Sequence, residues 1–321
     1  MRKIQLEIVI PEKFKGKRLD LALSKLFPEY SRSRIQSWIK AGEVEVNNSK
    51  YKQRNVVNSG DIIKINTTLK SIDKHQAEHI SLDVIHEDKA IIILNKPAGL
   101  VVHPGAGNPK HTLVNALLHF DEKLDVLPRA GIIHRLDKDT TGIMIIARTI
   151  ESYTYLVNEL QKRNIKRNYK AIICGQLVAG GVIENKIGRH PVHRTKMAVT
   201  DKGKLATTHY RIIKKFQHYT YLDIQLGTGR THQIRVHMNN EKHPIIGDPL
   251  YGKNTFLKKG INASLREFIK NFKRQALHAY NLEFTHPVSK KIISLKAELP
   301  DDMKNLIKKY KYQIIHTSVC Q

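Results

Sequence analysis

Short apolar segments rich in β-branched residues recur along the chain and constrain its fold more than any other feature. From residue 81 onward they predict strands at 82–85, 90–94, 143–147, 169–174, 207–213, 221–226, 277–284 and 292–297. The helical periodicity of apolar residues predicts fewer helices, at 112–119, 150–163, 231–239 and 265–272. Because so few helices separate the strands, we expect an α+β fold with a mainly antiparallel, mixed sheet rather than a doubly wound one.

The N-terminal residues predict a separate small α/β module. Apolar residues alternate over 4–10, as in a strand, and helical periodicity follows over 17–27 and 31–40. Short strands are expected at 44–46 and 62–65. We therefore expect a module over 1–66, with its core at about 16–66, and a polar linker over 67–80. The main domain would cover 81–305, and a basic, helical tail would cover 306–321.

The charge of the chain indicates a polyanionic partner. The chain has 321 residues, enough for about two domains. It carries 55 Lys and Arg against 29 Asp and Glu, a net charge of +26. Such a charge opposes folding through self-repulsion, and a polyanionic partner is the usual reason to tolerate it. Nucleic acid is the first candidate and an anionic membrane surface is the second.

Cysteine content and hydropathy exclude several classes. Cys174 and Cys320 are the only cysteines, too few for a disulfide framework or a cysteine-based zinc site. Their scarcity is typical of a reducing cytoplasm. Glu7 and Pro11 interrupt the first apolar run, so no signal peptide is expected. No segment approaches the roughly 20 apolar residues of a membrane span.

The segment 131–142 places polar residues between two apolar runs, the second of which begins after Gly142. In an extended chain, Arg135 and Asp137 point to the same side. A neighbouring arginine lowers the pKa of an aspartate, and an ionised, positioned carboxylate can act as a nucleophile. An ordinary Arg–Asp ion pair in a loop is the alternative.

Two further segments combine basic and polar residues. The predicted helix at 231–239 follows Gly229 and Arg230 and carries His232 and Arg235 on one polar stripe. Its N-terminus could hold a phosphate, and a solvated basic helix is the alternative. Basic residues around Tyr169 suit RNA, because the charges follow the backbone and the ring stacks on a base. The alternative is a tyrosine packed at a strand end.

No cofactor or metal is expected. Gly105 and Gly107 lack the third glycine of a dinucleotide loop, and neither a phosphate-binding P-loop nor a Gly-x-Ser-x-Gly elbow is present. His190 and His193 flank a proline without a cysteine or an obvious carboxylate nearby, which argues against a metal site.

Together, these motifs resemble the RluA-type pseudouridine synthase family. The match rests on residues 134–137, 140–142, Tyr169 and 229–235, with supporting matches at 95–99 and 243–249. The N-terminal module resembles an S4 RNA-binding domain. The segments 101–109 and 274–279 look most like the members that act on large-subunit ribosomal RNA.

The resemblance implies isomerisation of uridine to pseudouridine in RNA, an intramolecular transfer without cofactor or metal. It implies that Asp137 is the nucleophile, attacking either C1′ of the sugar or C6 of the base. Arg235 would pair with Asp137, and Arg135 would fill the place of the flipped uridine. Tyr169 would stack on the uracil and could help remove the proton from C5. Arg230 and His232 would contact RNA. The expected substrate is 23S ribosomal RNA or a pre-50S particle, in a stem-loop at the subunit interface.

The S4-like module would add RNA affinity through Arg18, Arg32, Arg34 and Lys40. We expect a cytoplasmic monomer without a membrane partner. Three other functions remain open at this point: a non-catalytic ribosome-assembly factor, an enzyme that hydrolyses the base from the sugar, and a synthase acting on tRNA or another rRNA site. A carboxylate among basic residues argues against the assembly factor, because it would repel phosphates.

Overall fold

The computed structural model of the chain describes residues 2–27, 30, 32–69, 75–105, 107–252, 261 and 263–317. Its N-terminal module holds a four-stranded antiparallel sheet in the order β1-β4-β2-β3. The elements are β1 (Arg2–Val9), α1 (Leu19–Leu26), α2 (Arg32–Ala41), β2 (Val44–Val46), β3 (Ser49–Lys50) and β4 (Ile62–Leu69), with a 3-10 turn at Glu12–Phe14. Both helices bury one apolar face in this module, including Leu19, Leu23, Ile35 and Ile39.

The main domain contains one ten-stranded mixed sheet. Its strands are β5 (Asp83–Glu87), β6 (Ile91–Lys96), β7 (Thr141–Ala147), β8 (Lys166–Cys174), β9 (Gly181–Arg189), β10 (Met197–Val199), β11 (Lys204–Lys215), β12 (Tyr219–Leu226), β13 (Leu277–Thr285) and β14 (Ile292–Lys296). The helices are α3 (Leu113–Phe120), α4 (Ile150–Gln161), α5 (Gln233–Asn240), α6 (Ala263–Asn271) and α7 (Asp301–Thr317), with 3-10 turns at Glu122–Val126 and Pro128–Gly131. The expected α+β class and mainly antiparallel pairing are confirmed.

Strand β13 joins the two halves of this sheet. The order is β10-β9-β11-β12-β8-β13-β7-β6-β5, and β14 also pairs with β13. In β13, Ala279 lies opposite Tyr169 of β8 on one side and Gly142 of β7 on the other. A Cβ atom at Gly142 would collide with the Ala279 backbone, so glycine permits this close approach. The join therefore places the start of β7 and Tyr169 of β8 on opposite sides of the same residue of β13.

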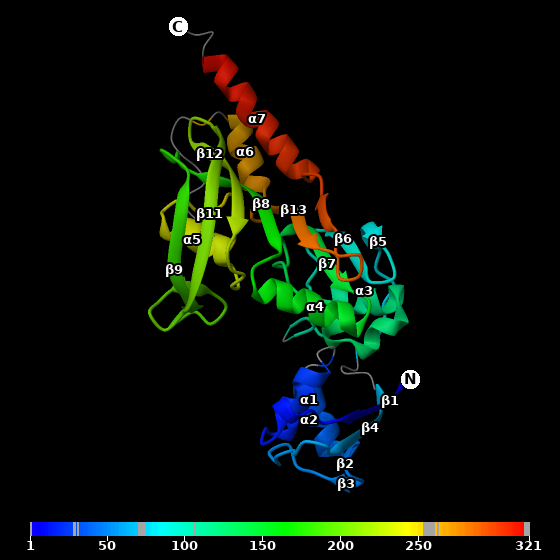
Figure 1. Ribbon diagram of the computed structural model, residues 1–321. Helices are drawn as coiled ribbons and strands as arrows, with labels where there is room; N and C mark the ends of the chain where they lie inside the picture. The colour runs from blue at the N-terminus through cyan, green and yellow to red at the C-terminus, as the bar shows by residue number, and fades with distance from the viewer. Residues whose placement is uncertain are drawn as a thin grey trace.

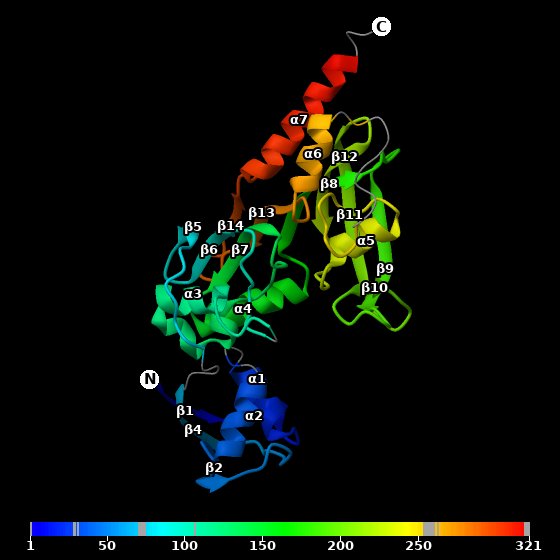
Figure 2. The same cartoon turned by 180° about the vertical axis from the view of Figure 1, so that it is seen from behind.

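The helices lie at different ends of the main domain. Figure 1 shows α3 and α4 at the end that faces the N-terminal module, and α7 extending from the opposite end. Figure 2 shows α5 against the strands β9, β10 and β11, which it contacts. Within the described ranges, no helix is both long and apolar enough to cross a membrane.

Several sequence-based boundaries are wrong. Strands β9 and β10 were not predicted at all. The tail expected from residue 306 is part of α7, in which Leu306 and Tyr310 are buried; Tyr310 stacks on Tyr219 at 4.7 Å between ring centroids. Residues 318–321 of that tail, and Cys320 among them, lie outside the described residues. The main domain therefore extends into the predicted tail.

The predicted linker is also too long. Strand β4 continues to Leu69, and the Asn115 side chain donates to the Gln76 carbonyl at 2.7 Å. Residues 70–74 lie outside the described residues. A direct contact also joins the two domains: the Arg34 guanidinium donates to the Val126 carbonyl at 2.7 Å. This bond gives Arg34 a role in holding the domains together.

Gly131 should be essential for stability. It adopts a left-handed φ of 80°, and a Cβ atom there would collide with the Ala147 carbonyl. We expect Gly131→Ala to lower the free energy of unfolding by about 3 kcal/mol or more, measured by chemical denaturation. Gly105→Ala is the control, because no heavy atom lies within 4 Å of a Cβ there. Equal stability of both variants would contradict this explanation.

Candidate active site

Asp137 lies in a loop that precedes β7 and not in a regular extended segment. The apolar residues before the loop form only an isolated bridge, between Ile132 and Ile146. The backbone N–H of Thr140 donates to the Asp137 carbonyl at 3.1 Å, which closes a turn. The Thr140 hydroxyl accepts a hydrogen bond from Gln275 at 2.9 Å. Backbone and side-chain bonds therefore hold the loop in place.

Buried Lys96 supports the same loop from β6. Its ammonium donates to the carbonyl oxygens of Pro97 at 2.7 Å, Leu100 at 2.9 Å and Lys138 at 2.8 Å. Burial lowers the pKa of Lys96 to about 7, although nearby carboxylates oppose this shift. Three acceptors match the three donors of the charged form. Because Lys138 follows Asp137, this lysine ties the loop to the end of β6.

Arg235 on α5 binds two carboxylates. Its Nη1 donates to Oδ2 of Asp137 at 2.8 Å, while Nε and Nη2 donate to Asp248 at 2.7 and 2.9 Å. Arg235 is 4% exposed, Asp248 is fully buried and Asp137 is 17% exposed. Burial would lower the pKa of Arg235, but the bonds and charges of Asp248 and Asp137 outweigh it and raise that pKa. The expected Arg235–Asp137 pairing is present, and Arg235 stays charged.

His232 closes the other side of Asp137. It is the N-cap of α5, in place of the helix start expected at residue 231, and has a left-handed φ of 55°. Its Nδ1 lies 2.8 Å from the Tyr251 hydroxyl oxygen, which also accepts the Met197 N–H. Its Nε2 lies 3.8 Å from Oδ1 of Asp137. Burial lowers the pKa of His232 despite the nearby carboxylate, so the ring is neutral at pH 7.

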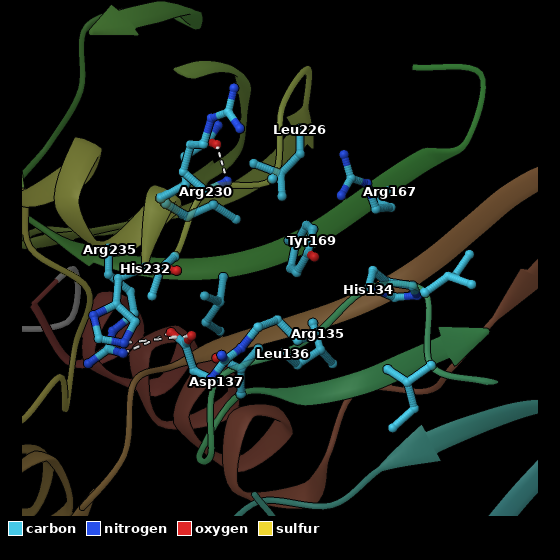
Figure 3. A pocket seen from close by; sticks show the side chains of 18 of the residues that line it. His134, Arg135, Leu136, Asp137, Arg167, Tyr169, Leu226, Arg230, His232 and Arg235 are labelled. Carbon is cyan, nitrogen blue, oxygen red and sulfur yellow. Dashed lines mark hydrogen bonds and ion pairs between the residues drawn. The ribbon is translucent and has the colours of Figure 1, made fainter. Parts of the chain in front are cut away.

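A cavity of about 270 Å³ opens beside Asp137. Figure 3 shows Asp137, Arg235 and His232 grouped together, with Tyr169 and Arg167 on the strand that crosses the site. Tyr169 is buried, and burial raises its pKa. Asp137 is the one acidic residue among the described residues that line this cavity. The arrangement can hold the Asp137 carboxylate against a flat, uncharged ring bound in the cavity.

Six of the residues predicted for the site line this one cavity, although they come from distant parts of the chain. They are Arg135, Asp137, Tyr169, Arg230, His232 and Arg235. The sequence interpretation did not single out Asp248, Lys96 or Arg167 as site residues. Asp248 and Lys96 were noted only within matching motifs. Asp248 follows the basic helix predicted at 231–239, and this position of an acidic residue could have drawn attention to it.

The four basic residues through which the S4-like module was expected to bind RNA lie away from the cavity lining. Arg18 and Arg32 form ion pairs with Asp20, whose side chain is fully buried, at 3.0 and 2.7 Å. Arg34 donates to the main domain, and Lys40 is exposed on α2. Two of the four therefore satisfy a buried carboxylate, a structural role that the sequence interpretation missed.

Family comparisons identify the class of protein. A family model of RNA pseudouridylate synthases matches residues 90–240, and an S4 domain model matches residues 17–63. Relatives 46–47% identical over nine-tenths of the chain carry pseudouridine synthase names. The chain belongs to the RNA pseudouridylate synthase family, enzymes of the isomerase class, and has an N-terminal S4 domain.

Individual relatives give more detail. The chain is 47% identical to "Ribosomal large subunit pseudouridine synthase D" of Xanthomonas campestris pv. campestris, over 94% of this chain and 91% of the relative. It is 47% identical to the protein of that name from Escherichia coli K12, over 95% and 94%.

Solved structures share the fold. "Human RNA Pseudouridylate Synthase Domain Containing 4" has a TM-score of 0.55 at 24% identity, covering 71% of this chain and 93% of its own. "Human RNA Pseudouridylate Synthase Domain Containing 1" has a TM-score of 0.53 at 18% identity, covering 74% and 97%.

The two-carboxylate geometry makes Asp248 important for activity. Asp248→Asn would leave Arg235 facing an amide and weaken its hold on Asp137. We expect kcat to fall about 10- to 100-fold, measured in a kinetic assay. The melting temperature, measured by thermal unfolding, should also fall. Glu298→Gln, at a carboxylate that pairs with Lys304 at the surface, is the control and should change neither. A wild-type kcat in Asp248→Asn would show that Arg235 holds Asp137 without help from Asp248.

Proposed function

We propose that this enzyme converts uridine to pseudouridine in large-subunit ribosomal RNA, at several uridines of a stem-loop at the ribosomal subunit interface. The observation that carries the proposal is Asp137, a single carboxylate held by Arg235 at a cavity lined by basic residues and Tyr169. The named relatives support the choice of ribosomal RNA. The S4 domain supports an RNA substrate.

The proposed chemistry begins with attack by Asp137. Its Oδ2 is bound to Arg235, so Oδ1 is the oxygen that would attack C1′ of the sugar or C6 of the base. The C1′–N1 bond breaks, the base turns, and C5 bonds to C1′. The bond between Asp137 and the substrate then breaks, C5 loses its proton, which Tyr169 could help remove, and N1 gains one. Arg235 orients Asp137 through the hydrogen bond to Oδ2, and its positive charge balances the carboxylate. Metal ions have no role in this proposal, and the described residues hold no cluster of ligands for one.

Substrate access requires that the uridine leave its stack. Flipping costs a few kcal/mol and least in a loop, which favours loop uridines. Tyr169 would then stack on the uracil, and exposed Arg135 would occupy the vacated place in the RNA. Arg230, also exposed, would contact phosphates near the opening of the cavity. Each role uses a residue that lines the cavity beside Asp137.

Asp137→Asn tests the nucleophile. The amide keeps the shape of the side chain but removes its charge, so we expect no pseudouridine and only a small loss of RNA affinity. Large-subunit rRNA transcript is incubated with each protein, pseudouridine is mapped by carbodiimide and primer extension, and free uracil is measured in parallel. Stops in the interface stem-loop with wild type alone would support the proposal.

Other outcomes of the same experiment would overturn parts of it. Free uracil would indicate a base-hydrolysing enzyme. Tight binding without either product would indicate an assembly factor, and stops elsewhere, or on tRNA alone, would change the substrate. Turnover by Asp137→Asn would remove this residue from the mechanism.

Arg235→Ala should also lower kcat strongly, because Asp137 would lose its partner.

Lys40 tests RNA binding by the S4 domain. It is exposed on α2, whereas Arg18 and Arg32 hold buried Asp20. We expect Lys40→Ala to raise KM and to reduce the salt dependence of RNA binding by about one counterion, without a loss of stability. Lys89→Ala, at an exposed turn before β6, is the charge-matched control. An unchanged salt slope would show that Lys40 does not contact RNA.

A further inference from the structure

Arg167 is a buried arginine to which the proposed reaction assigns no role. It lies on β8 and is 8% exposed. Its Nε is buried without a hydrogen-bond partner, and the guanidinium forms no ion pair or side-chain hydrogen bond with the residues that the structure describes. Arg167 and Tyr169 are two residues apart on one strand, so they share a face, and both line the cavity.

The other two arginines buried to this degree in the described part of the chain are neutralised. Arg235 binds Asp137 and Asp248, and Arg274 forms a two-point ion pair with Asp302 at 2.6 and 2.7 Å. A buried charge without a partner is costly, so sites that keep one do so for a ligand. Arg167 is thus an uncompensated cation inside the cavity.

The surroundings of Arg167 preserve this charge without neutralising it. His134 is its neighbour; burial first, and the charge of Arg167 second, lower the pKa of His134 to about 3. Its Nε2 accepts the Ile145 N–H at 3.2 Å, so the ring remains neutral and bound to the backbone. Burial also lowers the pKa of Arg167, but from so high a value that the guanidinium remains charged at pH 7.

A glycine makes room for the guanidinium. A Cβ atom at Gly229 would lie 2.7 Å from Nη1 of Arg167. Gly229 does not have a left-handed φ, so backbone freedom does not explain the glycine. The absence of a side chain there lets Arg167 lie close to the turn that precedes α5, beside the site of the flipped base.

We propose that Arg167 donates hydrogen bonds to the anionic oxygen that develops on the uracil during the reaction. This inference rests on the proposed function. If Asp137 attacks C1′, its oxygen bonds to C1′ as the C1′–N1 bond breaks, and the electron pair of that bond spreads over N1, O2 and O4. If Asp137 adds to C6, the C5=C6 pair moves through C4 onto O4. In both routes a uracil oxygen becomes anionic, and Arg167 stabilises it without giving up a proton.

The position of Arg167 favours the uracil over a phosphate. Phosphates of a bound RNA remain partly in water, where exposed Arg135 and Arg230 can meet them. Arg167 lies inside the cavity, on the face of β8 that carries Tyr169. A donor aimed at charge that develops only during the reaction contributes to kcat rather than to binding, commonly by 10²- to 10³-fold.

Arg167→Met tests the proposal, because methionine keeps an unbranched apolar chain without the charge. We expect a single-turnover rate of pseudouridine formation about 10²- to 10³-fold below wild type, while RNA Kd changes less than about threefold. The melting temperature should stay equal or rise, since an unpartnered buried cation is removed. Arg167→Lys should recover part of the rate. Arg211→Met, at an arginine whose side chain is 84% exposed, is the control with unchanged rate.

Gly229→Ala gives an independent variant that keeps the charge but displaces the guanidinium, and it should lower the rate in the same direction. A wild-type rate in Arg167→Met would overturn the proposal. Two other results for Arg167→Met would also overturn it. Weaker RNA binding with an unchanged rate and a smaller salt dependence would indicate a phosphate contact. A melting temperature lower by several degrees would indicate a structural role. If wild type forms no pseudouridine on any RNA tested, the proposed function fails and this inference fails with it.

Discussion

The site depends on one buried guanidinium that two carboxylates share. Asp248 uses its oxygens for Arg235 and for the backbone N–H groups of Leu250 and Tyr251, so it is fully occupied. Asp137 shares only one oxygen with Arg235. Two carboxylates and one guanidinium leave one negative charge, and this geometry assigns it to Asp137. The loop before β7, helix α5 and the segment after α5 are aligned by this single interaction.

The strands with the strongest apolar patterns could be predicted because they are buried on both faces. In β7 every residue from Thr141 to Ala147 is buried. Strand β9 was missed because its pattern is weak: apolar Val182, Ile183 and Ile187 lie among glycines and charged residues, and the strand is largely exposed. Helix α7 was taken as a tail because its basic residues mask the few apolar residues that contact the main domain.

The site was predicted unevenly for a related reason. Asp137 and Arg235 are 98 residues apart, and resemblance to a family, not spacing, indicated their pairing. Burial cannot be read from a basic sequence, so nothing distinguished buried Arg167 from exposed Lys166 beside it. Likewise, Arg18 and Arg32 look like RNA contacts until the buried carboxylate that they neutralise is visible. Charge was evident from the sequence, but its partners were not.

The central place of β13 has a consequence for biosynthesis. Strand β7, which follows the Asp137 loop, and strand β8, which carries Tyr169, are synthesised long before β13 (Leu277–Thr285), the strand that lies between them. A nascent chain that ends before this strand has two half-sheets, each with an unpaired edge. The carboxylate loop and the tyrosine strand can reach their final spacing only after β13 has left the ribosomal exit tunnel. The site therefore cannot form in a nascent chain that lacks this strand.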